Sequence, residues 1–168
     1  MSCLQQQRYQ HAIIFRIGDS DQQLVLTTGV LNHLVDHQQI GRNAPEAGGQ
    51  LFARFDGELI HVERATGPRS TDRRSRFGYI PDHRADQEEI NAAHREGLHF
   101  IGDWHTHPEP RPTPSFYDVR SIRSVVAGSK HHLNGFVLLI AGTDPFPRGL
   151  FVSLYGKHAI TPLIVHEP

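Results

Sequence analysis

The segment from Gly102 to Asp118 constrains the fold of this chain more than any other stretch. It reads Gly-Asp-Trp-His-Thr-His-Pro-Glu-Pro-Arg-Pro-Thr-Pro-Ser-Phe-Tyr-Asp. In an extended strand alternate side chains share a face, so His105 and His107 point to one side and Thr106 to the other. The four prolines of residues 108–114 lack amide donors. The strand must therefore end at His107, and the chain must turn a corner.

A helix is expected directly after this proline-rich turn. Ser115 is a favourable N-cap residue, which places Asp118 in the first helical turn, three residues after the cap. The apolar residues that would face inward repeat at helical spacing: Val119, Ile122, Val125 and Val126. Ser-x-x-Asp is also the spacing of an ordinary capping box, so this fragment alone does not indicate a functional site.

Two imidazoles and one carboxylate, brought from a strand and a helix start, are suitable ligands for a tetrahedral zinc site. His105, His107 and Asp118 would leave the fourth position to water, and an open position distinguishes a catalytic zinc from a structural one. His-x-His alone also occurs at solvated strand edges. The joint occurrence of both fragments, in this order and spacing, predicts one zinc ion (Zn2+) per chain.

The pattern His-x-His-Pro, then Ser-x-x-Asp with seven residues between the second His and the Ser, resembles the JAMM motif of the JAB/MPN metalloprotease family. That family also needs a glutamate far upstream, on the strand after the first helix, usually followed after one residue by two glycines. This chain offers Pro45-Glu46-Ala47-Gly48-Gly49, although many members carry Thr where Ala47 stands. The resemblance covers roughly residues 28–142 and implies the JAB/MPN architecture.

The resemblance also implies a role for each matched residue. Glu46 is implied as the general base, which takes a proton from the metal-bound water and passes it to the departing amine. Ser115 is implied to donate a hydrogen bond to the oxyanion of the tetrahedral intermediate, a role typically worth ~3 kcal/mol. His105, His107 and Asp118 are implied as the zinc ligands.

Members of this family cleave amide or isopeptide bonds at the C-terminus of ubiquitin-like proteins. The flanking residues and the compact length look most like bacterial JAB isopeptidases of CBASS antiphage operons, which release a nucleotidyltransferase (CD-NTase) conjugated through its C-terminus. The implied partners are a protein substrate with a ubiquitin-like or CD-NTase C-terminal tail and the cognate conjugating enzyme. Three alternatives stay open: JAB peptidases of other bacterial ubiquitin-like pathways, those of sulfur-carrier pathways, and non-catalytic MPN scaffolds.

Composition argues against several other classes of protein. The chain has 168 residues, enough for one well-packed domain and too few for two, so residues 1–168 are expected to form a single domain. A formal net charge of −1, with both signs interspersed, argues against nucleic-acid and membrane binding. Cys3 is the only cysteine, so no intrachain disulfide is possible. Without a signal-like apolar core or a run of ~20 apolar residues, a cytoplasmic protein is expected.

The rest of the chain predicts an α/β (α+β) fold, with a mixed, mainly antiparallel sheet flanked by about three helices. Short apolar or alternating runs predict strands at 12–15, 22–26, 48–55, 59–65, 99–107, 136–141, 149–155 and 160–165. Helices are predicted at 28–39, at 86–96 and from 115 onward. The run 136–141 is continuously apolar, so this strand is expected to be buried on both faces.

Three further features each have a structural and a functional interpretation. The basic segment 67–84, with Arg73 and Arg74 among its arginines, is either a solvated loop or a contact for carboxylates of a protein substrate. Asp103 shares a face with the two histidines, so it either hydrogen-bonds an imidazole or is an ordinary exposed carboxylate. Gly48 and Gly49 either let the backbone pass close to bound substrate or form a simple bulge.

Overall fold

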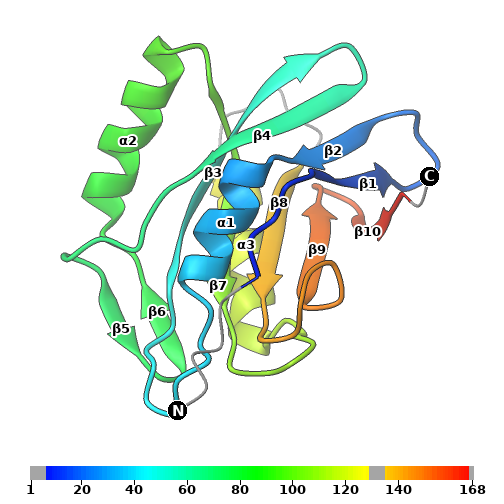
Figure 1. Ribbon diagram of the computed structural model, residues 1–168. Coiled ribbons are helices and arrows are strands. Elements are labelled where there is room, and N and C mark those ends of the chain that lie inside the picture. The colour runs from blue at the N-terminus through cyan, green and yellow to red at the C-terminus, as the bar shows by residue number, and fades with distance from the viewer. Residues whose placement is uncertain (1–6, 129–134, 167–168) are drawn as a thin grey trace.

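The computed structural model describes residues 7–128 and 135–166, within which eight strands close into a barrel (Figure 1). Around the barrel the strands follow the order β1-β10-β9-β8-β7-β3-β4-β2. The elements along the chain are β1 (Ile13–Ile17), β2 (Gln23–Leu26), α1 (Thr28–Asp36), β3 (Gly48–Asp56), β4 (Leu59–Ala65), β5 (Arg73–Ser75), β6 (Gly78–Ile80), α2 (His83–Arg95), β7 (His99–Thr106), α3 (Phe116–Gly128), β8 (Phe136–Ala141), β9 (Leu150–Tyr155) and β10 (Ile160–Val165). Cys3 lies outside the described residues.

The predicted mixed, mainly antiparallel sheet is confirmed. Six of the eight strand pairs in the barrel are antiparallel, and the β2–β4 and β7–β8 pairs are parallel. Closure into a barrel was not predicted, and it arises because β10 pairs with β9 on one side and with β1 on the other. Pairing between the first and last strands is a long-range contact that local periodicity does not reveal.

Strand β8 is buried on both faces, as its continuous apolar sequence predicts. Val137, Leu139 and Ala141 belong to the largest core cluster, which also contains the apolar side chains of α1. The alternate residues of β8 pack on the other side against Ile122 of α3. Figure 1 shows α1 in front of the sheet and α3 behind it, so two helices cover opposite faces of this strand.

Two helix boundaries differ from the prediction, and the reason is clear for the start of α2. Helix α2 begins at His83 rather than residue 86, because the carboxylate of Asp82 accepts the backbone N–H groups of Arg84 and Ala85 as an N-cap. Helix α1 ends at Asp36 rather than residue 39.

No helix in the described part of the chain combines the length and apolarity needed to cross a bilayer.

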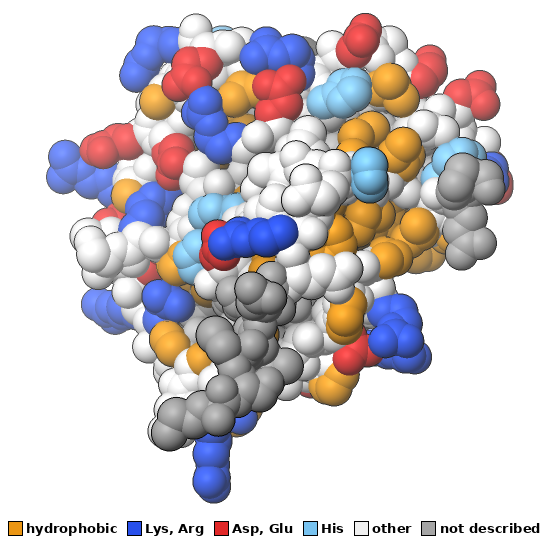
Figure 2. All heavy atoms as spheres, viewed as in Figure 1, with side chains coloured by type: hydrophobic (Ala, Val, Ile, Leu, Met, Phe, Trp, Pro, Cys, Tyr) orange, Lys and Arg blue, Asp and Glu red, His pale blue; other side chains and the backbone are white. Residues whose placement is uncertain are grey.

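The basic segment 67–84 is not simply a loop. It contains the short strands β5 and β6, which pair antiparallel as a separate two-stranded sheet (Figure 1). Strands of three residues are too short to show a clear alternation of apolar and polar side chains, so they were not predicted. Figure 2 shows acidic and basic side chains interspersed over the visible face of the molecule.

A bulge in β7 determines which side chains of this strand face the core. Leu51 pairs with Gly102 and Phe52 pairs with Phe100, so Ile101 is an extra residue. Only glycine fits at position 102, because φ is +152° and an added Cβ would lie 2.0 Å from the carbonyl oxygen of Val137. After the bulge Trp104 packs in the core, as predicted, and donates its indole N–H to the carbonyl oxygen of Thr66.

The glycine pair at the start of β3 approaches the protein's own backbone. A Cβ on Gly49 would lie 1.7 Å from the carbonyl oxygen of Thr66, and one on Gly48 would lie 2.8 Å from that of Trp104. These glycines therefore let β3 pass close to neighbouring backbone. The predicted bulge does not lie at them, because the register of β3 shifts farther along, between Leu51 and Phe52 and between Phe52 and Ala53.

Leu139→Ala is expected to destabilise the fold by about 2–5 kcal/mol, because it leaves a cavity beside α1 in the fully buried centre of β8. Ile164→Ala, on an exposed position of β10, is the matched control and should cost about 0.5 kcal/mol or less. Urea unfolding followed by tryptophan fluorescence measures both. Equal effects in the two variants would contradict the assignment of Leu139 to the core.

Candidate metal centre

The register of β3 against β7 brings Glu46 to the histidines. Gly48 pairs with His105 in this antiparallel ladder. The pairing continues past β3, because the N–H of Thr106 donates to the Ala47 carbonyl oxygen at 2.8 Å and the N–H of Ala47 donates to Thr106 Oγ1 at 2.9 Å. In an antiparallel pair each further step pairs the next residues, so Glu46 lies across from His107.

Asp118 reaches the same place from the first turn of α3. The N–H of Ser115 donates to Asp118 Oδ2 at 2.6 Å, and the N–H of Asp118 donates back to Ser115 Oγ at 3.2 Å. This reciprocal capping box confirms Ser115 as the N-cap. The proline-rich turn that leads to it is anchored, because Glu109 and Pro110 accept the backbone N–H groups of Thr143 and Asp144.

The two histidines and Asp118 form a compact cluster of potential ligand atoms. The Nε2 atoms of His105 and His107 are 3.2 Å apart. Asp118 Oδ1 lies 3.2 Å from the first of these nitrogens, and Oδ2 lies 3.3 Å from the second. Ligand atoms 2.0–2.1 Å from a tetrahedral zinc are about 3.3–3.4 Å apart. The donor atoms and their spacing therefore fit a zinc ion held by three side chains.

Glu46 stands slightly farther from the cluster. Its Oε1 lies 3.9 Å from His105 Nε2, and its carboxylate could itself complete a set with the two imidazoles, since the three ligand atoms lie within 4.8 Å of one another. The shorter contacts of Asp118 favour that residue as the third ligand. Glu46 is then left beside the position where a fourth ligand would bind.

The pKa values of the two carboxyl groups shift in opposite directions, although burial raises both. For Glu46, burial raises the pKa, and the two nearby imidazoles oppose this only in part. For Asp118, burial also raises the pKa, but the hydrogen bonds to His105 and His107 outweigh burial and hold the pKa well below its ordinary value. Asp118 is thus a permanent anion suited to bind a cation, whereas Glu46 is the better proton acceptor.

The cluster lies in a pocket of about 560 Å³, whose walls include Glu46, His105 and Asp118. Asp103 also lines this pocket. In the described structure it makes no hydrogen bond to an imidazole, and it is half-buried rather than exposed, so neither of its two interpretations is supported. Burial and the carboxylate of Asp86 raise the pKa of Asp103 to about 7.

Gln39 is a buried residue of the site that the sequence did not reveal. Its Nε2 donates to the carbonyl oxygens of Ala44 at 3.1 Å and Arg76 at 3.0 Å, and its Oε1 accepts from Thr106 Oγ1 at 3.0 Å. One side chain therefore ties the segment before Glu46 to the strand that carries the histidines. A glutamine after a helix has no distinguishing sequence signal, so only the three-dimensional contacts identify it.

Most arginines of segment 67–84 have partners within the chain. Arg69 pairs with Asp86 and Glu89, and Arg84 pairs with Glu88. Arg74 donates from Nε to the carbonyl oxygen of Glu46 at 2.7 Å. Replacing Arg73 and Arg74 together would therefore disturb Glu46 as well as any contact with substrate, which weakens that pair as a test of substrate binding.

The chain belongs to the family of prokaryotic homologs of the JAB domain, whose model matches residues 27–154. This match includes every residue of the cluster.

Four similar curated proteins carry the name CD-NTase/cGAS isopeptidase. The protein from Vibrio cholerae is 32% identical over 140 residues, which cover 82% of this chain and 86% of the relative. The protein from Escherichia coli is 31% identical over 115 residues, which cover 66% of this chain and 74% of the relative. A solution structure of a protein from Desulfitobacterium hafniense covers 84% of this chain and 88% of its own with a TM-score of 0.57 at 24% identity, which shows a shared fold.

His105→Ala, His107→Ala and Asp118→Ala are each expected to lose zinc, because two remaining ligands hold the ion far more weakly than three. Glu46→Ala should retain about one zinc per chain. His99→Ala changes an exposed histidine of the same strand and is the matched control. Metal analysis of the purified variants by mass spectrometry measures the zinc content. Full zinc in any of the first three would remove that residue from the site.

Substitutions at Ser115 are expected to separate its capping role from a catalytic one. Ser115→Gly should cost only a few tenths of a kcal/mol of stability, against about 1 kcal/mol for Ser115→Ala, because glycine is a tolerated N-cap. Both remove the hydroxyl donor, so both should lower turnover about 10²- to 10³-fold, while Ser115→Thr retains activity. Turnover and thermal unfolding are measured on the same samples. Activity that follows stability across the series would show that Ser115 only caps the helix.

Proposed function

We propose that this chain is a zinc-dependent isopeptidase that releases a CD-NTase from proteins to which it is conjugated through its C-terminus, within a CBASS antiphage system. The observation that carries the proposal is the His105–His107–Asp118 cluster, with Glu46 beside it, in a chain of the JAB family. The proposal of a CD-NTase substrate is supported by the names of the two relatives from Vibrio cholerae and Escherichia coli. The alignments with this chain cover 86% and 74% of the lengths of these two proteins.

The donor set suits hydrolysis of an amide bond. Zinc, when bound, would act as a Lewis acid and lower the pKa of bound water from ~16 toward ~7. The proposed task of Glu46 is to take a proton from that water and to deliver it to the nitrogen of the leaving amine. Its raised pKa, caused chiefly by burial, suits both transfers.

Ser115 is the proposed donor to the oxyanion that forms when the carbonyl carbon is attacked. Its Oγ accepts the N–H of Asp118, which uses the oxygen as an acceptor and leaves the hydroxyl hydrogen for another partner. Within the described residues this hydrogen has no acceptor. A substrate oxygen could therefore receive it without breaking the helix cap.

The test uses a CD-NTase joined through its C-terminal carboxyl group to a reporter protein by an amide bond. The wild-type protein is expected to release CD-NTase with an intact C-terminus, and a chelator should abolish the release until zinc is added back. Glu46→Ala should keep its zinc and lower turnover about 10²- to 10⁴-fold, whereas His99→Ala should behave as wild type. Mass spectrometry of the products identifies the bond that was cut.

Parallel fusions distinguish the alternatives. Cleavage of a sulfur-carrier or other ubiquitin-like C-terminus, but not of the CD-NTase fusion, would assign the chain to one of those pathways. A zinc-loaded protein that binds the CD-NTase fusion and cleaves none of them would be a scaffold.

A further inference from the structure

A second surface pocket, of about 550 Å³, opens beside the end of β7 and shares no lining residue with the pocket of the metal cluster. Pro108, the residue after His107, forms part of its wall. Arg76 forms another part and follows Ser75, whose carbonyl oxygen accepts the N–H of Glu46 at 2.7 Å. The pocket is therefore attached directly to the two segments that carry His107 and Glu46.

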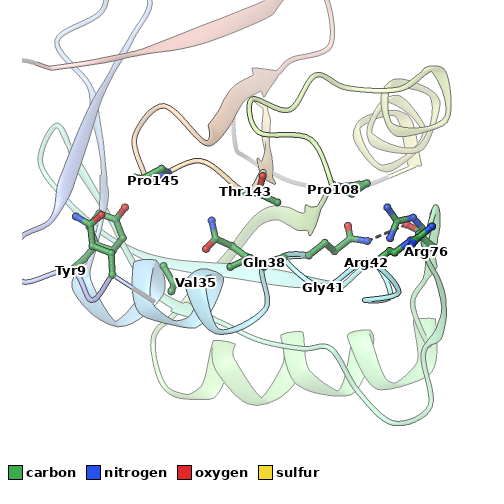
Figure 3. Close-up of a pocket in the computed structure, with 12 residues that line it drawn as sticks. Tyr9, Val35, Gln38, Gly41, Arg42, Arg76, Pro108, Thr143 and Pro145 are labelled. Atoms are coloured by element: carbon green, nitrogen blue, oxygen red, sulfur yellow. Dashed lines mark hydrogen bonds between the residues drawn. The ribbon is translucent and has the colours of Figure 1, made fainter. Parts of the chain in front are cut away.

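The charged side chains that line this pocket are two arginines, Arg42 and Arg76, without any acid. Figure 3 shows both at one end of the pocket, with Pro108 close by and Tyr9 at the far end. Within residues 7–128 and 135–166 neither arginine forms an ion pair, in contrast to Arg69 and Arg84. The pocket thus presents positive charge that no carboxylate of the described chain neutralises.

Arg76 contributes an unused hydrogen-bond donor. Its Nη1 is one of two buried side-chain polar atoms of the described residues that have no hydrogen-bond partner, the other being Thr66 Oγ1. Its guanidinium group is held over the ring of Phe77, 5.2 Å from the centroid. Because Nη1 itself is closed off from solvent, an anionic oxygen in the pocket would interact with the charge of the guanidinium group and with its remaining N–H donors.

The rest of the pocket suits a polypeptide better than an isolated ion. Pro145 and Pro108 lie along one side, opposite Val35 and Gln38 (Figure 3). The amide of Gln38 is already fixed by the carbonyl oxygens of Gly142 and Asp144, so this wall is preformed. Apolar and amide surfaces accept methylene groups and peptide backbone, whereas a free phosphate would use only the arginine end.

We infer that this pocket binds an acidic side chain of the protein substrate, with Arg42 and Arg76 as the carboxylate-binding groups. The inference rests on the proposed function only in taking the ligand to be a protein. It assigns to the chain a recognition site for a Glu or Asp residue located to one side of the bond that is cut.

Direct binding tests this site without requiring cleavage. The probes are an acetylated and amidated Ala-Glu-Ala peptide, the matched Ala-Gln-Ala peptide and inorganic phosphate, each titrated into the wild-type protein. The Nε–Hε NMR signals of arginine report on the pocket. The glutamate peptide is expected to shift the signals of Arg42 and Arg76 saturably, and the glutamine peptide should leave them unchanged.

Variants assign the response to the pocket. Arg76→Gln is expected to weaken binding of the glutamate peptide about tenfold, the loss typical of one charge-assisted hydrogen bond. Arg42→Gln, at an exposed position that tolerates substitution, should also weaken it, and Arg76→Lys should recover part of the affinity. Arg95→Gln, an exposed change on α2, is the matched control and should bind as wild type.

Three results would overturn the inference: equal shifts with both peptides, a response to phosphate but not to the glutamate peptide, or no saturable response at all. Each is independent of the CD-NTase cleavage test. A failed cleavage test with intact glutamate binding would refute the proposed reaction and leave this pocket assigned.

Discussion

The antiparallel pairing of β3 with β7 is the constraint on which the metal centre depends. Because side chains alternate along a strand, a shift of one residue in this register would turn both histidines toward the core and Thr106 toward the pocket. The bulge at Ile101 and Gly102 sets the phase of the strand after it. Hydrogen bonds on both sides of Ala47 then continue the pairing as far as Glu46.

Local sequence predicted much of this arrangement. The His-x-His alternation, the Ser115 cap and the continuous apolar run of β8 are short-range signals, and each produces the expected local structure. These successes share a cause, which is that each depends on a backbone period or a cap formed within a few residues.

Features that depend on distant contacts were not predicted. Barrel closure requires β1 to meet β10, and the three hydrogen bonds of Gln39 join segments that are far apart in the chain. The start of α2 was placed late because Asp82 was not recognised as its cap. The sequence did not predict ion-pair partners for the arginines of segment 67–84. In the structure, carboxylates of α2 form ion pairs with Arg69 and Arg84.

The carboxylate of Asp118 serves two structures at once, since it accepts the Ser115 N–H that starts α3 and also contacts both imidazoles. An ion that binds this carboxylate binds the folded chain only, so its binding free energy adds to the stability of the helix start. Metal occupancy and order in the first turn of α3 are then thermodynamically linked. If the site holds zinc as proposed, loss of the ion would loosen the first turn of α3 as well as empty the site, so the shape of the pocket wall would depend on metal supply.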